Sequence, residues 1–165
     1  MTRHKDILIA LRRITRAIDL HSRKLMKSSG LTAPQLVVLQ CIAEGTAETP
    51  SAIARDVSLS QATVTAILDR LQKNGLTRRE KSPTDRRSVV VTLTPEGQAT
   101  LDDAPELLQA GFLREFSKLA LWEQTGLISA LQRVAELMDA DDVDAAPILQ
   151  VGDIRTPLPT PPDAP

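Results

Sequence analysis

The chain has 165 residues, of which 42% are hydrophobic and 25% are charged, as expected for a folded domain with a short appendage. Aromatic residues make up only 2%, which argues against nucleic-acid modules that stack bases on exposed rings and against aromatic-rich β-sandwiches. The net charge of −1 hides an asymmetry, because residues 1–30 carry +6, residues 60–90 carry +4 and residues 96–165 carry −9. The two basic segments predict an anionic partner.

The residues that usually carry catalysis are sparse. His4 and His21 lie too far apart on one predicted helix to share a metal ion or a proton relay. The sequence has no glycine-rich phosphate loop, paired-histidine metal motif or nucleophile elbow. We therefore expect no enzyme, no cofactor and no metal. The single cysteine, Cys41, lies in an apolar run and is predicted to be a buried small hydrophobic residue.

The first predicted helix covers residues 5–28. One apolar stripe runs along this otherwise basic helix, formed by Ile7, Leu11, Ile14, Ile18 and Leu25. Gly30 is expected to end the helix. The longest early apolar stretch, residues 7–11, is too short for a signal-peptide core or a membrane span, so we expect a cytoplasmic protein.

Three further helices are marked by their capping residues. Thr32 followed by Gln35 forms a capping box for a helix that Gly45 ends. Thr49 and Pro50 open a short helix, and after a tight connection Ser60 caps a helix over residues 61–73. Gly75 is expected to end that helix, with Leu76 placed for a Schellman motif.

After this point the apolar period changes from 3.6 to 2, which predicts two strands over residues 76–81 and 88–93. The turn-rich tip between them is basic and contains Arg86 and Arg87. Thr94 and Pro95 start a helix that is predicted to run towards Leu119, with irregularity near Pro105 and Gly111. A last helix is predicted over residues 122–138.

A short helix, a tight turn and a capped amphipathic helix make a helix-turn-helix, and the hairpin after it makes a wing. The second helix carries a small, polar outer face that can approach base edges closely. We predict that its major-groove residues are Ser60, Gln61, Ala62, Thr63, Thr65 and Ala66. Arg70 and Lys73 are better placed for phosphates, and an arginine at the wing tip suits a narrow minor groove.

Plainer explanations exist for each of these features. The outer face of the helix is also what a solvated helix in any bundle shows, and a charged hairpin tip is also a soluble loop. Asp69 on the outer face would repel phosphate unless it is paired, and Lys73 four residues later is one candidate partner.

At this point the sequence resembles the winged helix-turn-helix of MarR-type bacterial transcriptional regulators. The resemblance rests on Leu31-Thr32-Ala33-Pro34-Gln35, Ser60-Gln61-Ala62-Thr63-Val64-Thr65, Leu68-Asp69-Arg70-Leu71, Asn74-Gly75-Leu76, Asp85-Arg86-Arg87 and Val91-Thr92-Leu93-Thr94-Pro95-Glu96-Gly97. It implies a mainly α fold with a small β-hairpin wing and with N- and C-terminal dimerisation helices. It also implies that Arg86 reaches the minor groove and that Arg87 bridges to Asp69 to anchor the wing.

The resemblance implies a homodimer, and a two-fold dimer implies a palindromic operator. The predicted dimerisation residues are Ile7, Leu11, Ile14, Ile18, Leu127, Leu131, Val134 and Met138. Repression by promoter occupancy is the expected mechanism, and Arg16 and His21 are the candidate residues for binding a small molecule that releases the DNA. The alternative is a winged helix that contacts protein, although such a module would show apolar anchors where this chain shows Ala, Thr, Arg and Lys.

The predicted organisation is a MarR-like domain over residues 1–140 and an acidic, proline-rich tail over residues 141–165. Within the domain, residues 31–97 form the winged helix-turn-helix, and residues 1–30 and 98–140 form the dimerisation helices. Ile148, Leu149, Val151 and Ile154 are candidates for docking along the dimer body. The tail also resembles those of family members that regulate compatible-solute (ectoine-type) synthesis genes.

Overall fold

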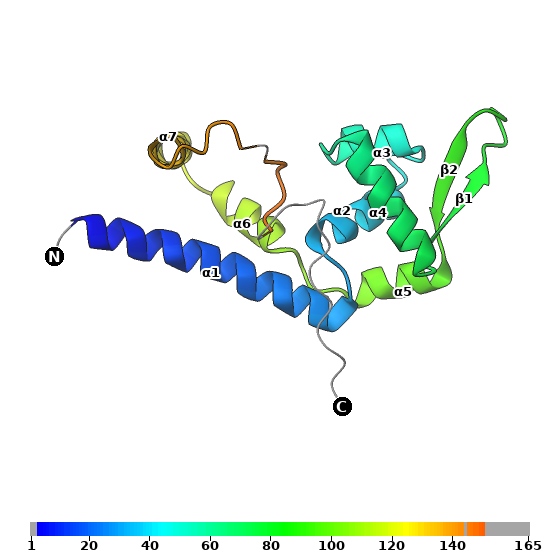
Figure 1. Cartoon of the computed structure of the whole chain (residues 1–165), viewed down its shortest axis with the longest axis horizontal. Helices are drawn as coiled ribbons and strands as arrows, with labels where there is room; N and C mark the ends of the chain where they lie inside the picture. Colours follow the sequence, from blue (N-terminus) through cyan, green and yellow to red (C-terminus); the bar gives the residue numbers. More distant parts are fainter. Residues whose placement is uncertain (1–2, 144, 151–165) are drawn as a thin grey trace. The chain divides into compact units, whose positions relative to one another are not determined.

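The computed structural model describes residues 3–143 and 145–150. Its elements, in chain order, are α1 (Arg3–Ser29), α2 (Ala33–Glu44), α3 (Pro50–Asp56), α4 (Gln61–Lys73), β1 (Thr77–Lys81), β2 (Val89–Leu93), α5 (Pro95–Asp103), α6 (Leu108–Phe116) and α7 (Leu121–Leu137) (Figure 1). The described chain forms two compact units, residues 3–105 with Leu149 and Gln150, and residues 106–148. Each unit is described by itself.

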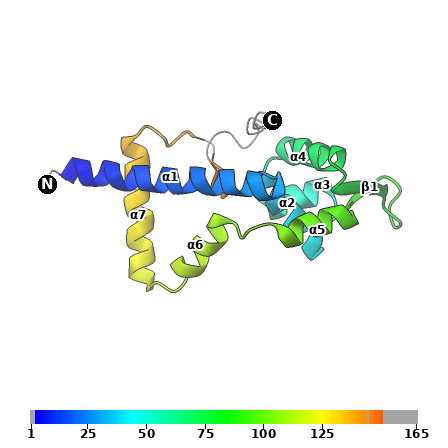
Figure 2. The same cartoon turned by 90° about the horizontal axis from the view of Figure 1, so that it is seen from below.

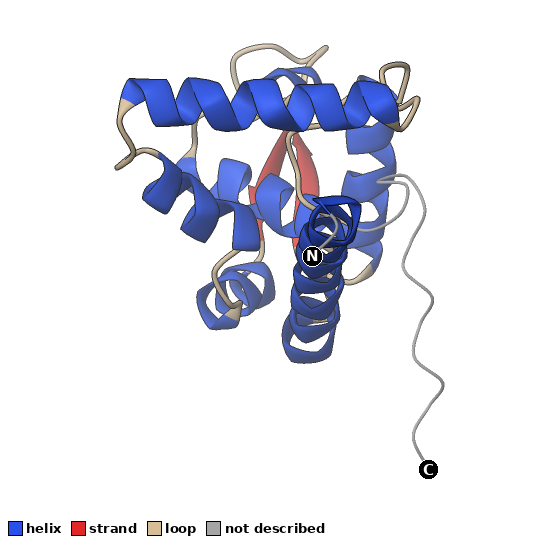
Figure 3. Cartoon of the chain, turned by 90° about the vertical axis from the view of Figure 1, so that its left-hand side faces the viewer, coloured by secondary structure: helices blue, strands red, loops and turns tan. Residues whose placement is uncertain are grey.

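Helices account for nearly all of the regular structure, and the single β-hairpin is the exception (Figure 3). This agrees with the predicted fold class of a mainly α protein with a small wing. The boundaries of α2, α3, α4 and both strands fall within one or two residues of the predicted ones. The tail residues Val151 and Ile154 lie outside the described residues, while Ile148 is buried and Leu149 is exposed.

The predicted capping box at the start of α2 is confirmed. The backbone N–H of Thr32 donates to Gln35 Oε1 at 3.0 Å, and the backbone N–H of Gln35 donates to Thr32 Oγ1 at 3.4 Å. These bonds satisfy two amide groups that a helix start leaves without partners. Gly45 ends α2 in the left-handed region at φ +67°, which glycine adopts without a Cβ penalty.

A tight turn joins α3 to α4. Ser58 takes a left-handed conformation at φ 56°, and the Leu59 N–H donates to the Ala54 carbonyl at 3.0 Å, which reverses the chain. Ser60 then caps α4, because its hydroxyl oxygen accepts from the Thr63 N–H at 3.1 Å. The turn and the cap together fix the direction in which α4 leaves α3.

The end of α4 has the predicted Schellman geometry. The N–H of Leu76 donates to the Leu71 carbonyl at 2.9 Å, and that of Gly75 donates to the Gln72 carbonyl at 3.0 Å. Gly75 has φ +74°, so the chain can turn directly from α4 into β1. α4 and the hairpin are therefore joined by a short connection whose backbone N–H groups are hydrogen-bonded.

The hairpin pairs β1 and β2 antiparallel, with Thr77 opposite Leu93 and Arg79 opposite Val91. The N–H of Val91 also donates to the Glu48 carbonyl at 2.8 Å, which ties the outer side of β2 to the loop before α3. At its base the hairpin is tied to α5, because Gly97 sits where an added Cβ would lie 2.0 Å from the Leu76 carbonyl oxygen. That approach explains why glycine is needed three residues after Thr94.

The core lies within the first unit, under α2, α3, α4 and the hairpin. Its fully buried side chains include Leu25, Leu31, Leu36, Leu39, Ile53, Val64, Leu68, Leu71 and Val91. Only the C-terminal half of α1 enters this core, through Ser22 and Leu25, and its residues 3–10 are all exposed. Figure 2 shows α1 as one continuous rod whose C-terminal end leads into α2.

The single helix predicted from Thr94 towards Leu119 is wrong, because the structure has two helices there, α5 and α6. The break lies at the predicted irregularity near Pro105. Ala104 before the proline is extended, with φ −70° and ψ 139°, as steric clash with the proline ring favours. Gly111 lies inside α6 and causes no break.

Candidate nucleic-acid interface

The second helix of the helix-turn-helix, α4, which we call the reading helix, has two clearly different faces. One face is buried and holds Val64, Ile67, Leu68 and Leu71. The opposite face is exposed and holds Gln61, Ala62, Thr65, Ala66, Asp69, Arg70 and Lys73. Two alanines on the N-terminal half leave the helix backbone accessible to a close partner, while Arg70 and Lys73 place positive charge on the C-terminal half.

Thr63 does not lie on the exposed face, which corrects its prediction as a major-groove residue. It is only 7% exposed, and its hydroxyl forms a 2.7 Å hydrogen bond with the Ser60 hydroxyl. The reason is angular, since Thr63 lies about 100° from the fully buried Val64 on the helix and so falls at the edge of the buried face. The side chain of Ser60 is likewise engaged in capping α4.

Thr65 stays on the exposed face, but its hydroxyl donates to the Gln61 carbonyl at 2.8 Å. The hydroxyl proton is therefore used within the helix, and an exposed Thr65 can offer a partner its methyl group and an acceptor oxygen. A methyl group suits contact with a thymine methyl better than a hydrogen bond to a base edge.

The wing tip is an ordered turn built around Ser82 and Asp85. The N–H of Ser82 donates to the Ser88 carbonyl at 2.9 Å, and the N–H of Arg87 donates to Asp85 Oδ1 at 3.0 Å. Arg86 and Arg87 are exposed, and within residues 3–143 and 145–150 neither takes part in an ion pair. Two positive charges are thus carried at the end of a structured hairpin without a partner.

Asp69 is paired with Arg79 and not with Arg87, so the expected wing bridge is corrected. Arg79 Nη1 lies 2.6 Å from Asp69 Oδ1 and donates to Gln72 Oε1 at 3.2 Å. The alternative pair of Asp69 with Lys73 does not occur among the described ion pairs either. Arg87 lies in the tip beyond Lys81, whereas Arg79 lies in the middle of β1, the strand that packs against α4.

The strand geometry of β1 accounts for the place of Arg79. In a strand, residues two apart share a face, so Arg79 lies on the same face as Thr77, which is only 3% exposed. β1 packs against α4, and the side chain of Arg79 reaches Asp69 and Gln72. Alternation along β1 groups Arg79 with Thr77 and Lys81 and does not by itself select a partner on α4.

The predicted ligand residues on α1 are not brought together. Arg16 is exposed and forms an ion pair with Asp19 at 2.9 Å, and Asp19 also binds Arg23 at 3.1 Å. His21 lies five positions from Arg16, on a different side of the helix, and is half-buried. An open hollow lies along the first half of α7 instead, lined by Leu121, Trp122, Thr125, Gly126 and Ser129.

The predicted dimerisation stripes on α1 and α7 are largely uncovered within one chain. Ile7, Ile14, Leu127, Leu131 and Met138 are 44–63% exposed, and Leu11, Ile18 and Val134 are half-buried. α7 has no buried residue at all along Leu121–Leu137. A helix with an apolar face needs something to cover that face.

Cys41 is buried, as predicted, and has polar partners. It is 4% exposed, and its Sγ donates to Asp56 Oδ2 at 3.1 Å. Burial, together with this hydrogen bond to a carboxylate, raises the pKa of the Cys41 thiol to about 11. The thiol is therefore protonated at neutral pH, and among the described residues no group of three or more His, Cys, Asp or Glu side chains is arranged to hold a metal ion.

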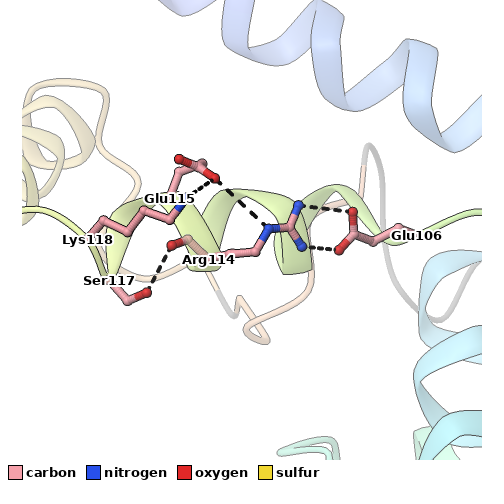
Figure 4. A network of polar contacts seen from close by, with 5 residues as sticks. All are labelled: Glu106, Arg114, Glu115, Ser117 and Lys118. Atoms are coloured by element: carbon pink, nitrogen blue, oxygen red, sulfur yellow. Dashed lines mark hydrogen bonds and ion pairs between the residues drawn. The ribbon is translucent and has the colours of Figure 1, made fainter.

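In the second unit, polar side chains form an exposed network on and just before α6 (Figure 4). Arg114 is ion-paired with Glu106 in the segment before α6, and Lys118 Nζ lies 2.8 Å from Glu115 Oε1. The guanidinium of Arg114 lowers the pKa of Glu106. The network connects the segment before α6 with the C-terminal end of the helix, and both of its cations, Arg114 and Lys118, are ion-paired.

These features define a class of protein. A capped reading helix with a small exposed face, followed directly by a hairpin with arginines at its tip, is a winged helix-turn-helix of the DNA-binding kind. No helix of the described residues is both long and apolar enough to cross a membrane.

The comparisons name the family. The MarR family model matches residues 31–89. The chain is 36% identical over 98 residues to YsmB, an HTH-type transcriptional regulator of Bacillus subtilis, covering 59% of this chain and 67% of that one. It is 28% identical over 109 residues to the homoprotocatechuate degradative operon repressor of Escherichia coli, covering 66% and 74%. The chain therefore belongs to the MarR family and is a transcriptional regulator rather than an enzyme.

A solved structure extends the similarity to the fold. The PcaV transcriptional regulator of Streptomyces coelicolor, crystallised with its natural ligand, superimposes with a TM-score of 0.53 at 25% identity. The match covers 78% of this chain and 91% of PcaV, so it reaches well beyond the winged helix-turn-helix into the flanking helices.

Proposed function

We propose that this regulator is a repressor that binds a palindromic DNA operator as a homodimer. The observation that carries the proposal is the pair of unpaired arginines at the tip of an ordered wing, beside a reading helix whose exposed face begins with Gln61, Ala62, Thr65 and Ala66. This is a surface of small, polar and positive groups, which suits a duplex and lacks the apolar anchors of a protein-binding surface.

Each part of this surface has a proposed role. Gln61, Ala62, Thr65 and Ala66 meet base edges in the major groove, and Arg70 and Lys73 meet phosphates. Arg86 enters the adjacent minor groove, where negative potential is concentrated when the groove is narrow. Arg87, whose guanidinium forms no ion pair within the described chain, adds charge at the same tip.

The dimer is supported by the uncovered stripes of α1 and α7. Each protomer of a two-fold dimer brings one reading helix and one wing, so the operator has two half-sites about one helical turn apart. Repression is supported by the similarity to the homoprotocatechuate degradative operon repressor. Release by a small molecule is supported by the similarity to PcaV, which was crystallised with its natural ligand.

The first test is selection of DNA by the purified protein from a random-sequence duplex library at about 0.15 M salt. We expect one enriched palindrome. A library that shows no enrichment would contradict sequence-specific DNA binding and would favour the alternative of a winged helix that contacts protein.

The wing assignment is tested with the selected duplex. Arg86→Ala is expected to weaken binding by about 1–3 kcal/mol, because it removes a minor-groove contact. The matched control is Arg78→Ala, which removes the same charge from the same hairpin at a residue paired with Glu80 at 3.1 Å. Fluorescence anisotropy at matched salt measures both, and equal losses for the two variants would contradict a specific role for the tip.

A further inference from the structure

The contacts of Arg79 have a geometry that suggests more than surface charge pairing. Its Nη1 is within 2.6 Å of Asp69 Oδ1 and 3.2 Å of Gln72 Oε1, so one nitrogen meets two side chains of α4. Asp69 and Gln72 are three residues apart and therefore lie on one side of the helix. The Arg79 side chain is 29% exposed, well below the 61% of its neighbour Arg78.

This contact lies at a particular level of the hairpin. Arg79 on β1 is directly opposite Val91 on β2, and the N–H of Val91 donates to the Glu48 carbonyl at 2.8 Å. This residue pair is thus held from both strands. The Arg79 side chain binds α4, and the Val91 backbone N–H binds the loop before α3. Beyond it only two more residue pairs, Glu80 with Val90 and Lys81 with Val89, precede the tip. Figure 1 shows the tip of the hairpin pointing away from the helices.

The contact also has an electrostatic consequence. Asp69 is exposed on the same outward side of α4 as Ala62 and Ala66, where a bare carboxylate would face the phosphates of a bound duplex. Arg79 places a positive charge against it. The pair is solvent-exposed, and such pairs contribute little to folding stability, so its effect is on geometry and local charge.

We infer that Arg79 is a positioning residue for DNA binding, which sets the wing against the reading helix and neutralises Asp69, without itself contacting DNA. The inference rests on the proposed DNA binding for its affinity readouts. It assigns to the middle residue pair of the hairpin the anchoring role that the resemblance to MarR-type regulators implies for Arg87.

The affinity test uses Arg79→Met, which keeps much of the side-chain volume and removes the charge. We expect roughly a tenfold loss of affinity for the selected duplex, and an unchanged affinity would overturn the inference. The sharper expectation is a change of sign in the effect of Asp69→Asn on affinity for the duplex when Arg79 is replaced. In the Arg79→Met background, Asp69→Asn should restore at least about threefold, because it removes a carboxylate that has lost its partner. No restoration would overturn the neutralising role.

Two further readouts separate positioning from other roles. In an Arg86→Ala background, a direct phosphate contact by Arg79 would lower the slope of log K against log salt by about 0.9 in Arg79→Met, and a positioning residue would leave that slope unchanged. If the wing is positioned by Arg79, the loss caused by Arg86→Ala should shrink to less than about threefold in the Arg79→Met background. Arg79→Lys, which keeps the charge, should bind with intermediate affinity. A slope that falls by one contact in the Arg86→Ala background, or losses that simply add, would overturn the inference.

A measurement without DNA keeps the inference separate from the proposed function. Spin labels at Ala62→Cys on α4 and Thr84→Cys in the wing tip, in a Cys41→Ser background and diluted with unlabelled protein, report the distance between helix and wing by pulsed electron paramagnetic resonance. We expect one narrow distance distribution with Arg79 present and a broader or shifted one in Arg79→Met, with a melting temperature within about 3 °C. Identical distributions would overturn the inference even if the protein binds DNA, and a broadened one would support wing positioning even if no duplex were selected.

Discussion

The two amphipathic helices α4 and α7 have similar apolar periodicity but opposite surroundings. In α4, five of thirteen residues are buried, among them Val64, Leu68 and Leu71 at full burial. In α7, none of seventeen residues is buried, and Leu121 and Trp122 are 78% and 76% exposed. The sequence predicts that both apolar stripes pack against other parts of the protein or of its dimer, and only the stripe of α4 is buried within one chain.

The difference shows which parts of this protein are complete in one copy. The stripe of α4 is covered by α2, α3 and the hairpin, so the reading helix is held rigidly and its outer face is free for a partner. The stripe of α7 is what the proposed dimer would cover. A matched pair of truncations tests this division most strongly.

Leu68→Ala and Leu131→Ala remove the same atoms from the two helices. Leu68 is fully buried, so its truncation should lower the free energy of unfolding by about 2–5 kcal/mol. Leu131 is 52% exposed in one chain, so its truncation should instead raise the dimer dissociation constant. Urea unfolding and sedimentation equilibrium measure the two quantities. The comparison fails if Leu131→Ala leaves dimerisation unchanged.

Gly97→Ala tests how closely the elements of the first unit approach. An added Cβ would meet the Leu76 carbonyl oxygen at 2.0 Å, so α5 must move away from the base of the wing. We expect a loss of about 1–3 kcal/mol in unfolding free energy. Gly126→Ala in α7, where nothing lies within 4 Å of the added atom, is the control and should be neutral or slightly stabilising. Thermal unfolding that ranks the two substitutions the other way would show that the tight contact is not maintained in solution.

Cys41 tests the buried polar contact in the first unit. With its pKa raised to about 11, roughly one thiol in a thousand is ionised at pH 8. We expect iodoacetamide to label the folded protein far more slowly than the urea-unfolded protein, as followed by mass spectrometry. Rapid labelling in the native state would mean that α2 and α3 open readily and that the buried contact between Cys41 and Asp56 is not maintained in solution.

The ion pair of Glu106 with Arg114 gives the smallest expected effect, because both groups are fully exposed. The pKa of Glu106 is lowered from 4.5, so its contribution to stability is present above that value and is lost as pH falls below it. The difference in Tm between the wild type and Glu106→Gln should therefore narrow from about pH 7 to about pH 3.5. Asp142→Asn, at an exposed position, is the control. A difference that does not change with pH would indicate that the pair is not formed in solution.

Much of the fold can be predicted from local sequence, because capping residues and helix-ending glycines act on residues only a few positions away in the chain. Thr32, Thr49 and Ser60 each accept a hydrogen bond from the third residue after them, so their roles depend on neighbours that the sequence lists directly. Gly45 and Gly75 end helices through backbone conformations that glycine alone adopts freely. Pro105 also predicts an irregularity at the right place, but the sequence predicts one irregular helix where the structure has two separate helices.

The candidate site divides in the same way. The exposed face of α4 and the basic wing tip came from helical periodicity and turn composition. The burial of Thr63 did not, because a residue at the edge of an apolar stripe is buried or exposed according to what packs beside it. The partner of Asp69 was also misassigned, since several arginines lie within reach along the chain and only their placement in space selects one.

The sequence by itself therefore determined the element order from α1 to the start of α5, the caps, the turns and the chemical character of the reading surface, because these depend on residues within a few positions of each other. The tertiary structure alone decided that Arg79 meets Asp69 and Gln72, that Gly97 lies against Leu76 and that α7 is left uncovered in one chain. These contacts depend on how a hairpin and helices that are separate in sequence come together, and hydrophobic periodicity does not encode that distance or angle.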